Sequence, residues 1–144
     1  MIAVACLAVL PAKMVAAHCE VPCGIYGDQA RFVEMLENTD TIAKAIDSVH
    51  ELAKDHTPQV INQAIRWTNT KEEHATATQH IIAQYFMTQR LKPDADKYTE
   101  KITLLHRILL EAMKCKQTTD VAHIETIRSL LKKFEVLYFG RNLH

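Results

Sequence analysis

The chain has 144 residues, and its 17 Lys and Arg balance its 17 Asp and Glu, so the formal net charge is zero. Nucleic-acid binding usually leaves a basic patch, and this balance gives no reason to expect one. The length allows one domain with a substantial core, and 48% hydrophobic residues with only three Gly and four Pro favour a compact helical protein.

Residues 1–17 differ in character from the rest of the chain. Ile2 to Leu10 is apolar throughout, and the segment ends in the small residues Val15-Ala16-Ala17. This pattern predicts a secretory signal cut after Ala17, and the apolar run is too short to span a membrane. Because no Lys or Arg precedes that run, removal of a pro-peptide in the cytoplasm is the alternative. We expect an exported protein, either periplasmic or secreted.

Residues 18–26 read His-Cys-Glu-Val-Pro-Cys-Gly-Ile-Tyr and place one histidine and two cysteines within six positions. Nitrogen and thiolate donors suit Ni, Cu and Zn rather than Mg or Ca. Cleavage after Ala17 would also leave His18 with a free α-amine beside its imidazole. The segment is therefore a candidate metal site at a mature N-terminus.

The pattern His-Cys-x-x-Pro-Cys-Gly-x-Tyr resembles the nickel hook of the nickel-containing superoxide dismutases. It matches at every fixed position, which are His18, Cys19, Pro22, Cys23, Gly24 and Tyr26. The resemblance implies an antioxidant oxidoreductase that converts superoxide to O2 and H2O2 with one nickel ion per subunit. It further implies His18, Cys19 and Cys23 as metal ligands, Tyr26 as a gate over the metal, and a homohexamer of four-helix bundles without a membrane span.

The donor types themselves also favour nickel. The His18 amine, the Cys19 amide nitrogen and the two thiolates form a set of two nitrogens and two sulfurs, with the imidazole available as an axial ligand. An amide nitrogen binds only after losing its proton, which requires a metal such as Ni(II) or Cu(II) that favours a square plane. Pro22 would turn the chain so that Cys23 returns towards Cys19, and Gly24 would permit a tight backbone.

Other interpretations of the hook stay open from the residues alone. Cys19 and Cys23 could form a plain disulfide, as exported proteins often do. A tetrahedral zinc site is a second interpretation, although it lacks a fourth side-chain ligand nearby. An exported nickel or copper binding protein without turnover is the alternative function.

Residues 27–144 are predicted to form one all-α domain, an up-down-up-down four-helix bundle that carries the hook at its N-terminus. The predicted helices cover about 28–55, 58–90, 93 or 94 to 116, and 120–139. Asp28 is expected to cap the first helix, Thr57 and Pro58 to start the second, and Gly140 to stop the last.

The buried faces follow from apolar residues at helical spacing. In the first two predicted helices they are Phe32, Met35, Leu36, Ile42, Ile46, Val49, Ala53, Ile61, Ile65, Ala75, Ile82 and Phe86. In the last two they are Tyr98, Ile102, Leu105, Ile108, Leu109, Ala112, Met113, Ile124, Ile127, Leu130, Leu131, Phe134 and Leu137 or Tyr138.

The second predicted helix is long for a bundle of this size, and its stretch 67–70 is the weakest helix former. We expect a kink or a local break there. We also expect the surplus length of this helix, with Trp67, Tyr85 and Phe86, to pack against another subunit. Cys115 is interpreted as a small buried apolar residue.

Charged residues of the second helix offer candidates around the metal. Lys71, Arg66 and Arg90 are candidates for a positive potential that attracts an anionic substrate. Glu72, Glu73 and His74 form a polar group that could contact a hook.

Overall fold

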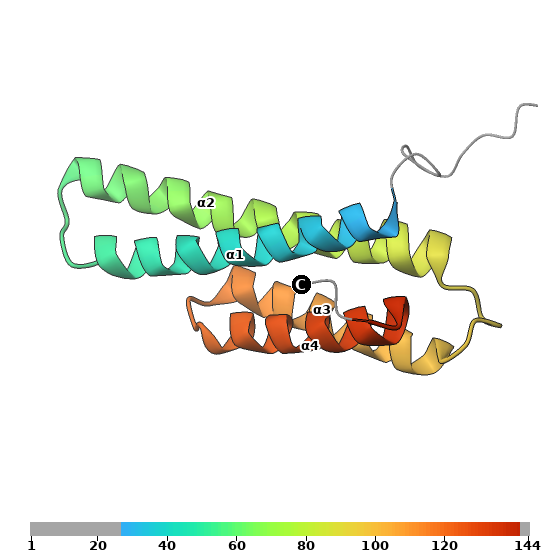
Figure 1. The fold of residues 1–144 in the computed structure, drawn as a ribbon. Coiled ribbons are helices and arrows are strands. Elements are labelled where there is room, and N and C mark those ends of the chain that lie inside the picture. The colour runs from blue at the N-terminus through green and yellow to red at the C-terminus, as the bar shows by residue number, and fades with distance from the viewer. Residues whose placement is uncertain (1–26, 142–144) are drawn as a thin grey trace, which may run out of the picture.

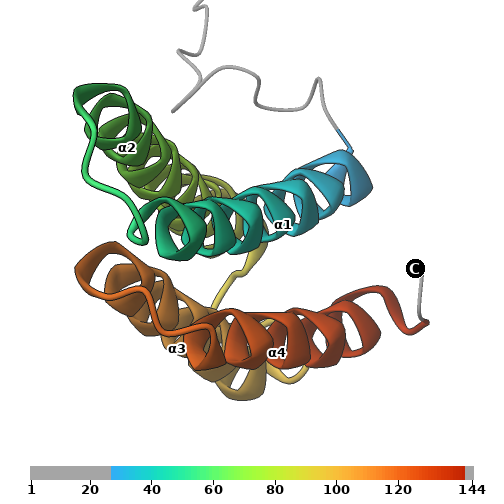
Figure 2. The same cartoon turned by 90° about the vertical axis from the view of Figure 1, so that its left-hand side faces the viewer.

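The computed structural model describes residues 27–141. They form α1 (Asp28–Leu52), α2 (Pro58–His80), η1 (Ile81–Arg90), α3 (Tyr98–Gln117) and α4 (Ala122–Phe139). The segment η1 is a π-helix that continues α2 without a break in the chain. Figure 1 shows that each helix runs antiparallel to the one before it in the chain, which is up-down-up-down topology, and Figure 2 shows the α1–α2 pair lying over the α3–α4 pair. The predicted all-α bundle is confirmed, and within residues 27–141 there is no strand.

Two of the predicted helix ends carry the signals that the sequence suggested. The Thr57 hydroxyl accepts a hydrogen bond of 3.3 Å from the Val60 amide, and Pro58 is the first residue of α2. Gly140 ends α4 with φ of 71°, a left-handed conformation that glycine adopts without steric cost. These local signals are reliable because they depend only on residues within one turn.

Other boundaries differ from the prediction. α3 begins at Tyr98 rather than at 93 or 94, because the segment before it turns and Lys97 has φ of 52°. α1 ends at Leu52, about one turn early. The predicted kink at 67–70 is wrong, since α2 is regular there and the helix changes to π geometry only at Ile81.

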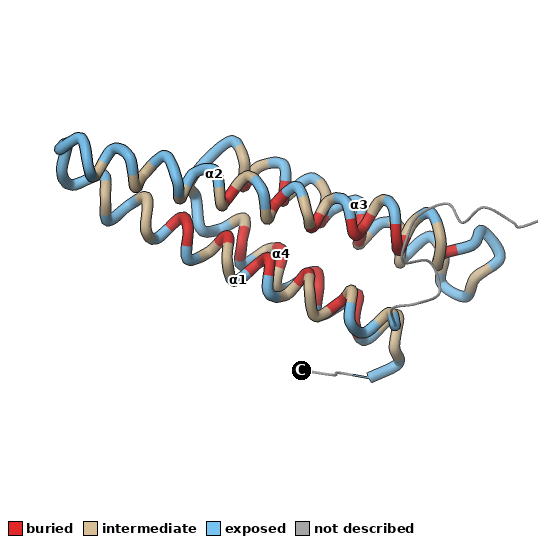
Figure 3. The backbone as a smooth tube through the Cα atoms, turned by 90° about the horizontal axis from the view of Figure 1, so that it is seen from above, coloured by how far each residue is buried: buried red, intermediate tan, exposed pale blue. Residues whose placement is uncertain are grey.

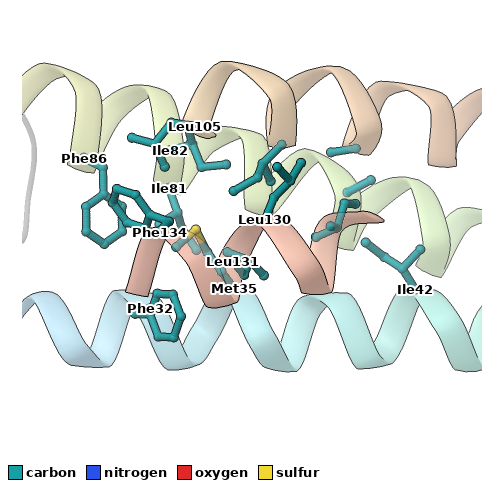
Figure 4. Packing of buried hydrophobic residues seen from close by; sticks show 14 of the residues in the cluster. Phe32, Met35, Ile42, Ile81, Ile82, Phe86, Leu105, Leu130, Leu131 and Phe134 are labelled. Atoms are coloured by element: carbon teal, nitrogen blue, oxygen red, sulfur yellow. The ribbon is translucent and has the colours of Figure 1, made fainter. Parts of the chain in front are cut away.

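The core lies where all four helices overlap. Figure 4 shows Phe32, Phe86 and Phe134 together near one end and Ile42 towards the other. Most predicted core positions are confirmed as buried, namely Phe32, Met35, Ile42, Ile46, Ala75, Ile82, Phe86, Leu105, Ile108, Ala112, Ile124, Ile127, Leu130, Leu131 and Phe134. The buried Cys115 also behaves as the sequence suggested, as a small apolar core residue.

The α1–α2 hairpin reaches past the α3–α4 pair, and there the burial prediction fails. At 1.5 Å per residue, the 25 residues of α1 span about 37 Å, whereas the 18 residues of α4 span about 27 Å. Ile61 and Ile65 are 49% and 56% exposed on this projecting part. Figure 1 shows the projection, and Figure 3 shows that its tip is exposed. Ala53 at the tip is exposed, and so is Met113 on α3.

The aromatic residues at the end of the second long helix pack within their own chain. Tyr85 and Phe86 are 5% and 0% exposed, so their predicted role against another subunit is wrong. Trp67 is half-buried, with the Lys44 ammonium 5.9 Å from its ring centroid. Among the described helices, none combines the length and apolar character needed to cross a membrane.

Candidate metal centre

The predicted ligands precede the first helix. His18, Cys19 and Cys23 lie outside the described residues, as do Pro22, Gly24 and Tyr26. The predicted leader, residues 1–17, lies outside them too. The structure therefore shows the surroundings of the point where the hook joins the bundle.

That junction is the N-terminus of α1. Gly27 occupies the N-cap position with no side-chain cap, and its carbonyl accepts from the Ala30 amide at 3.0 Å. The sequence assigned capping to Asp28, but Asp28 is the first helical residue and its carboxylate faces other helices. Tertiary partners have replaced the local cap that the residue type suggested.

The Asp28 carboxylate joins three elements. Its Oδ1 accepts a hydrogen bond of 2.7 Å from the Tyr85 hydroxyl of η1, and its Oδ2 accepts one of 2.7 Å from the Tyr138 hydroxyl of α4. Nε of Arg90 lies 2.7 Å from Oδ1, close enough for an ion pair although its N–H is not well aligned for a hydrogen bond. We call Asp28, Tyr85, Arg90 and Tyr138 the Asp28 cluster.

The π-helix brings the two η1 members of the cluster together. Tyr85 and Arg90 are five residues apart, and a π-helix pairs i with i+5, so both side chains lie on one face. Nη2 of Arg90 donates to the Tyr85 hydroxyl at 2.8 Å, and its guanidinium carbon lies 4.8 Å from the centroid of the Tyr85 ring. Burial and the bond to Asp28 raise the pKa of Tyr85, so its proton stays in place to bridge the two residues.

Tyr138 connects the Asp28 cluster to the hydrophobic core. Its ring centroid lies 5.2 Å from that of Phe134, 5.4 Å from that of Phe86 and 4.9 Å from that of Phe139. Burial, followed by the bond to Asp28, raises the pKa of the Tyr138 phenol far above its ordinary value. The Tyr138 hydroxyl therefore stays protonated and donates to Asp28, and its ring is packed among other aromatic rings of the core.

A groove between α1 and the α2–η1 helix begins one turn after Asp28. It is lined by Arg31, Glu34, Glu72, Glu73, Thr76, Ala77, His80 and Ile81. Nη1 of Arg31 lies 2.6 Å from Oε2 of Glu34, so part of this charge is already paired. Glu72 and Glu73 face this groove, whereas His74 turns to α1, where its Nδ1 lies 2.7 Å from Oδ1 of Asn38.

Two of the three cations proposed to attract substrate are already bound to other groups. The Lys71 ammonium is buried and donates to the backbone carbonyls of Cys115, Lys116 and Thr118 at 2.6, 2.9 and 3.1 Å. The ammonium therefore caps the C-terminal end of α3 and does not project to the surface. Arg90 is paired with Asp28, and Arg66 is exposed.

The described residues do not offer a second metal centre. Between residues 27 and 141, no group of three or more His, Cys, Asp or Glu side chains is placed to hold a metal ion. Cys115 is fully buried, and burial raises the pKa of its thiol to about 11, so it stays protonated and apolar. A thiol in that state is a poor metal ligand.

The Asp28 cluster was missed in the sequence. Its members are separated by 57 and 110 residues in the chain, and a spacing of five does not match the α-helical pattern. The available signal was an acidic residue two positions after the hook, and local capping rules explained that residue too simply.

A family model described as nickel-containing superoxide dismutase matches residues 13–142 of the 144-residue chain. No match was found among curated proteins or among solved structures. The matched range includes the hook motif and all the described helices.

Proposed function

The chain belongs to the nickel-containing superoxide dismutase family, and we propose that His18, Cys19 and Cys23 hold its nickel ion at a processed N-terminus. As a member of that family it is an oxidoreductase that converts two superoxide anions and two protons to O2 and H2O2. The observation that carries the site assignment is the complete hook motif inside the matched range.

The donor set suits nickel in particular. Two thiolates, an amine and a deprotonated amide would donate strongly to the metal, and nickel bound there would supply Ni(II)/Ni(III) cycling. Zinc gains nothing from such a plane because it prefers a tetrahedron. The only cysteine among the described residues, Cys115, is buried and protonated, which supports assigning the thiolate ligands to the hook.

The other hook residues act on geometry and access. We assign Pro22 and Gly24 to the turn that brings Cys23 back towards Cys19. We assign Tyr26 to the entrance of the site, where a phenol can donate a hydrogen bond to a small anion and exclude larger ones. Cleavage after Ala17 is required because it creates the α-amine of His18.

Assembly and location are further parts of the proposal. A homohexamer would give the exposed Ile61 and Ile65 of the projecting hairpin a surface to pack against, since exposed apolar groups often mark interfaces. Export followed by cleavage is supported by the apolar run and the small residues before His18. Light scattering of the purified protein and mass spectrometry of its N-terminus test these two parts.

Three alanine variants test the ligand assignment. Protein that begins at His18 is loaded with nickel, and nickel content and superoxide consumption are measured. We expect Cys19→Ala and Cys23→Ala to lose most of the activity, with much weaker nickel binding. Cys115→Ala is the matched control, because it removes a thiol that is buried in the core, and it should retain both properties.

Two outcomes would contradict the proposal. If the protein binds nickel but consumes superoxide no faster than free nickel does, the alternative function, a metal-binding protein without turnover, is favoured. Full activity in Cys19→Ala or Cys23→Ala would show that the ligands lie elsewhere.

A further inference from the structure

The Asp28 cluster lies at the only covalent connection between the hook and the bundle. α1 has no side-chain cap, and within its first turn the Gly27 carbonyl accepts from the Ala30 amide at 3.0 Å. The Asp28 carboxylate adds tertiary contacts to this helix end, through its bonds to Tyr85 and Tyr138 and its ion pair with Arg90. Three side chains from η1 and α4 thus hold Asp28, the second residue after the hook.

The cluster is built to be rigid. Tyr85 is 5% exposed, and its hydroxyl donates to Asp28 while accepting from Arg90. Tyr138 is packed against Phe86 and Phe134 in the core. Charge-assisted hydrogen bonds of this length are roughly twice as strong as neutral ones.

The chain length makes this position important for the reaction. Tyr26 is two residues before Asp28 and Cys23 is five residues before it, so at 3.3–3.6 Å per residue they lie within about 7 and 18 Å of it. Movement of Asp28 would therefore shift the point from which Tyr26 and the hook extend. A displacement of about 1 Å in a positioning group can cost about 100-fold in rate.

We propose that the Asp28 cluster is a positioning device that fixes Tyr26 and the hook relative to the bundle. This inference rests on the proposed function, because it assigns the cluster to the placement of that same site. Asp28, Tyr85, Arg90 and Tyr138 do not touch substrate in this account; they act through the hook. The π-helix has a purpose here as well, since it places Tyr85 and Arg90 on the face that Asp28 contacts.

Two variants test the proposal in the nickel-loaded protein that begins at His18. Asp28→Asn keeps the size of the side chain and removes the charge that Arg90 pairs with. Tyr138→Phe keeps the ring in the core and removes a single hydrogen bond. The matched control is Tyr98→Phe, which makes the same chemical change in a half-buried tyrosine whose hydroxyl is not a partner of Asp28.

Each variant is examined by nickel content, visible circular dichroism of the bound nickel, denaturant unfolding and the second-order rate constant for superoxide. For Asp28→Asn and Tyr138→Phe we expect nickel retention, an altered nickel spectrum and a rate constant lower by about ten- to hundredfold. Tyr98→Phe should match the wild-type spectrum and rate constant. A purely stabilising cluster would lower the unfolding midpoint without changing the spectrum.

The proposal is overturned if both variants keep the wild-type nickel spectrum and rate constant. The wild-type sample separates this result from a failure of the proposed function. If wild-type protein binds nickel without consuming superoxide, the assigned reaction fails, while the spectra of the variants still test the positioning of the hook.

Discussion

The buried Lys71 ammonium provides a sharp test of how the bundle is held together. It comes from α2 and donates to three carbonyls at the C-terminus of α3, a helix end whose carbonyls have no partners within the helix. Lys71→Met keeps the apolar stem and removes all three donors. The residue is 3% exposed, so the methionine should fit the same space.

The size of the effect follows from the surroundings of the three carbonyls. A hydrogen bond from a charged donor contributes about 1.5–3 kcal/mol. The carbonyl of the buried Cys115 loses its ammonium partner inside the core, whereas those of the half-buried Lys116 and exposed Thr118 can bind water. Counting one full loss and two partial ones, we expect Lys71→Met to lower the free energy of unfolding by about 3 kcal/mol.

Urea unfolding followed by circular dichroism measures this difference. Lys132→Met, on the exposed face of α4, is the control and should change the free energy of unfolding by less than about 0.5 kcal/mol. A loss below about 1 kcal/mol for Lys71→Met would contradict a strong net contribution of the ammonium to stability. It would show that the desolvation free energy of the buried ammonium nearly cancels the stabilisation from its three hydrogen bonds.

Three further results are expected. Burial alone would raise the pKa of Glu111, but hydrogen bonds from Lys114 and His123 lower it overall. The ionised Glu111 therefore contributes stability above the ordinary carboxyl pKa, and this contribution is lost as the pH falls through the lower pKa of the folded state. The difference in melting temperature between wild type and Glu111→Gln should accordingly shrink between pH 6 and about pH 3. Iodoacetamide at pH 8 should label Cys19 and Cys23 of the metal-free folded protein but leave Cys115 unmodified until urea is added. The reason is that the Cys115 thiol is buried and has a pKa of about 11. Rapid labelling of Cys115 in the folded protein would contradict its burial. Thr57→Ala should lower the free energy of unfolding by about 1 kcal/mol through loss of the α2 cap, and no change would mean that Pro58 alone starts the helix.

The sequence predicted the bundle well where local rules decide the outcome. Thr57, Pro58 and Gly140 set helix ends through contacts within one turn, and the buried stripes of α3 and α4 follow from helical spacing. Ile61 and Ile65 show the limit of that method. Periodicity reports which side of a helix is apolar, but it does not report that the neighbouring helices end too early to cover it.

The polar contacts between the helices could not be predicted for a different reason. Asp28, Lys71 and Arg90 each have a plausible local or surface role by residue type, as a cap or as exposed cations. In the structure Lys71 and Asp28 bind partners 44 and 110 residues away, respectively. Arg90 binds Tyr85, which lies five residues before it in the π-helix. Long-range pairing of polar groups leaves no periodic trace, so only the fold reveals it. The hook ligands stay a prediction from the motif.

One added residue in front of His18 tests the central claim most directly. The extended chain keeps both thiolates and the imidazole but moves the free α-amine away from the metal. Nickel content and superoxide consumption are compared between this chain and protein that begins at His18. We expect the extended chain to lose most of its activity while still binding some nickel loosely. Equal activity in the two proteins would contradict an amine ligand from His18.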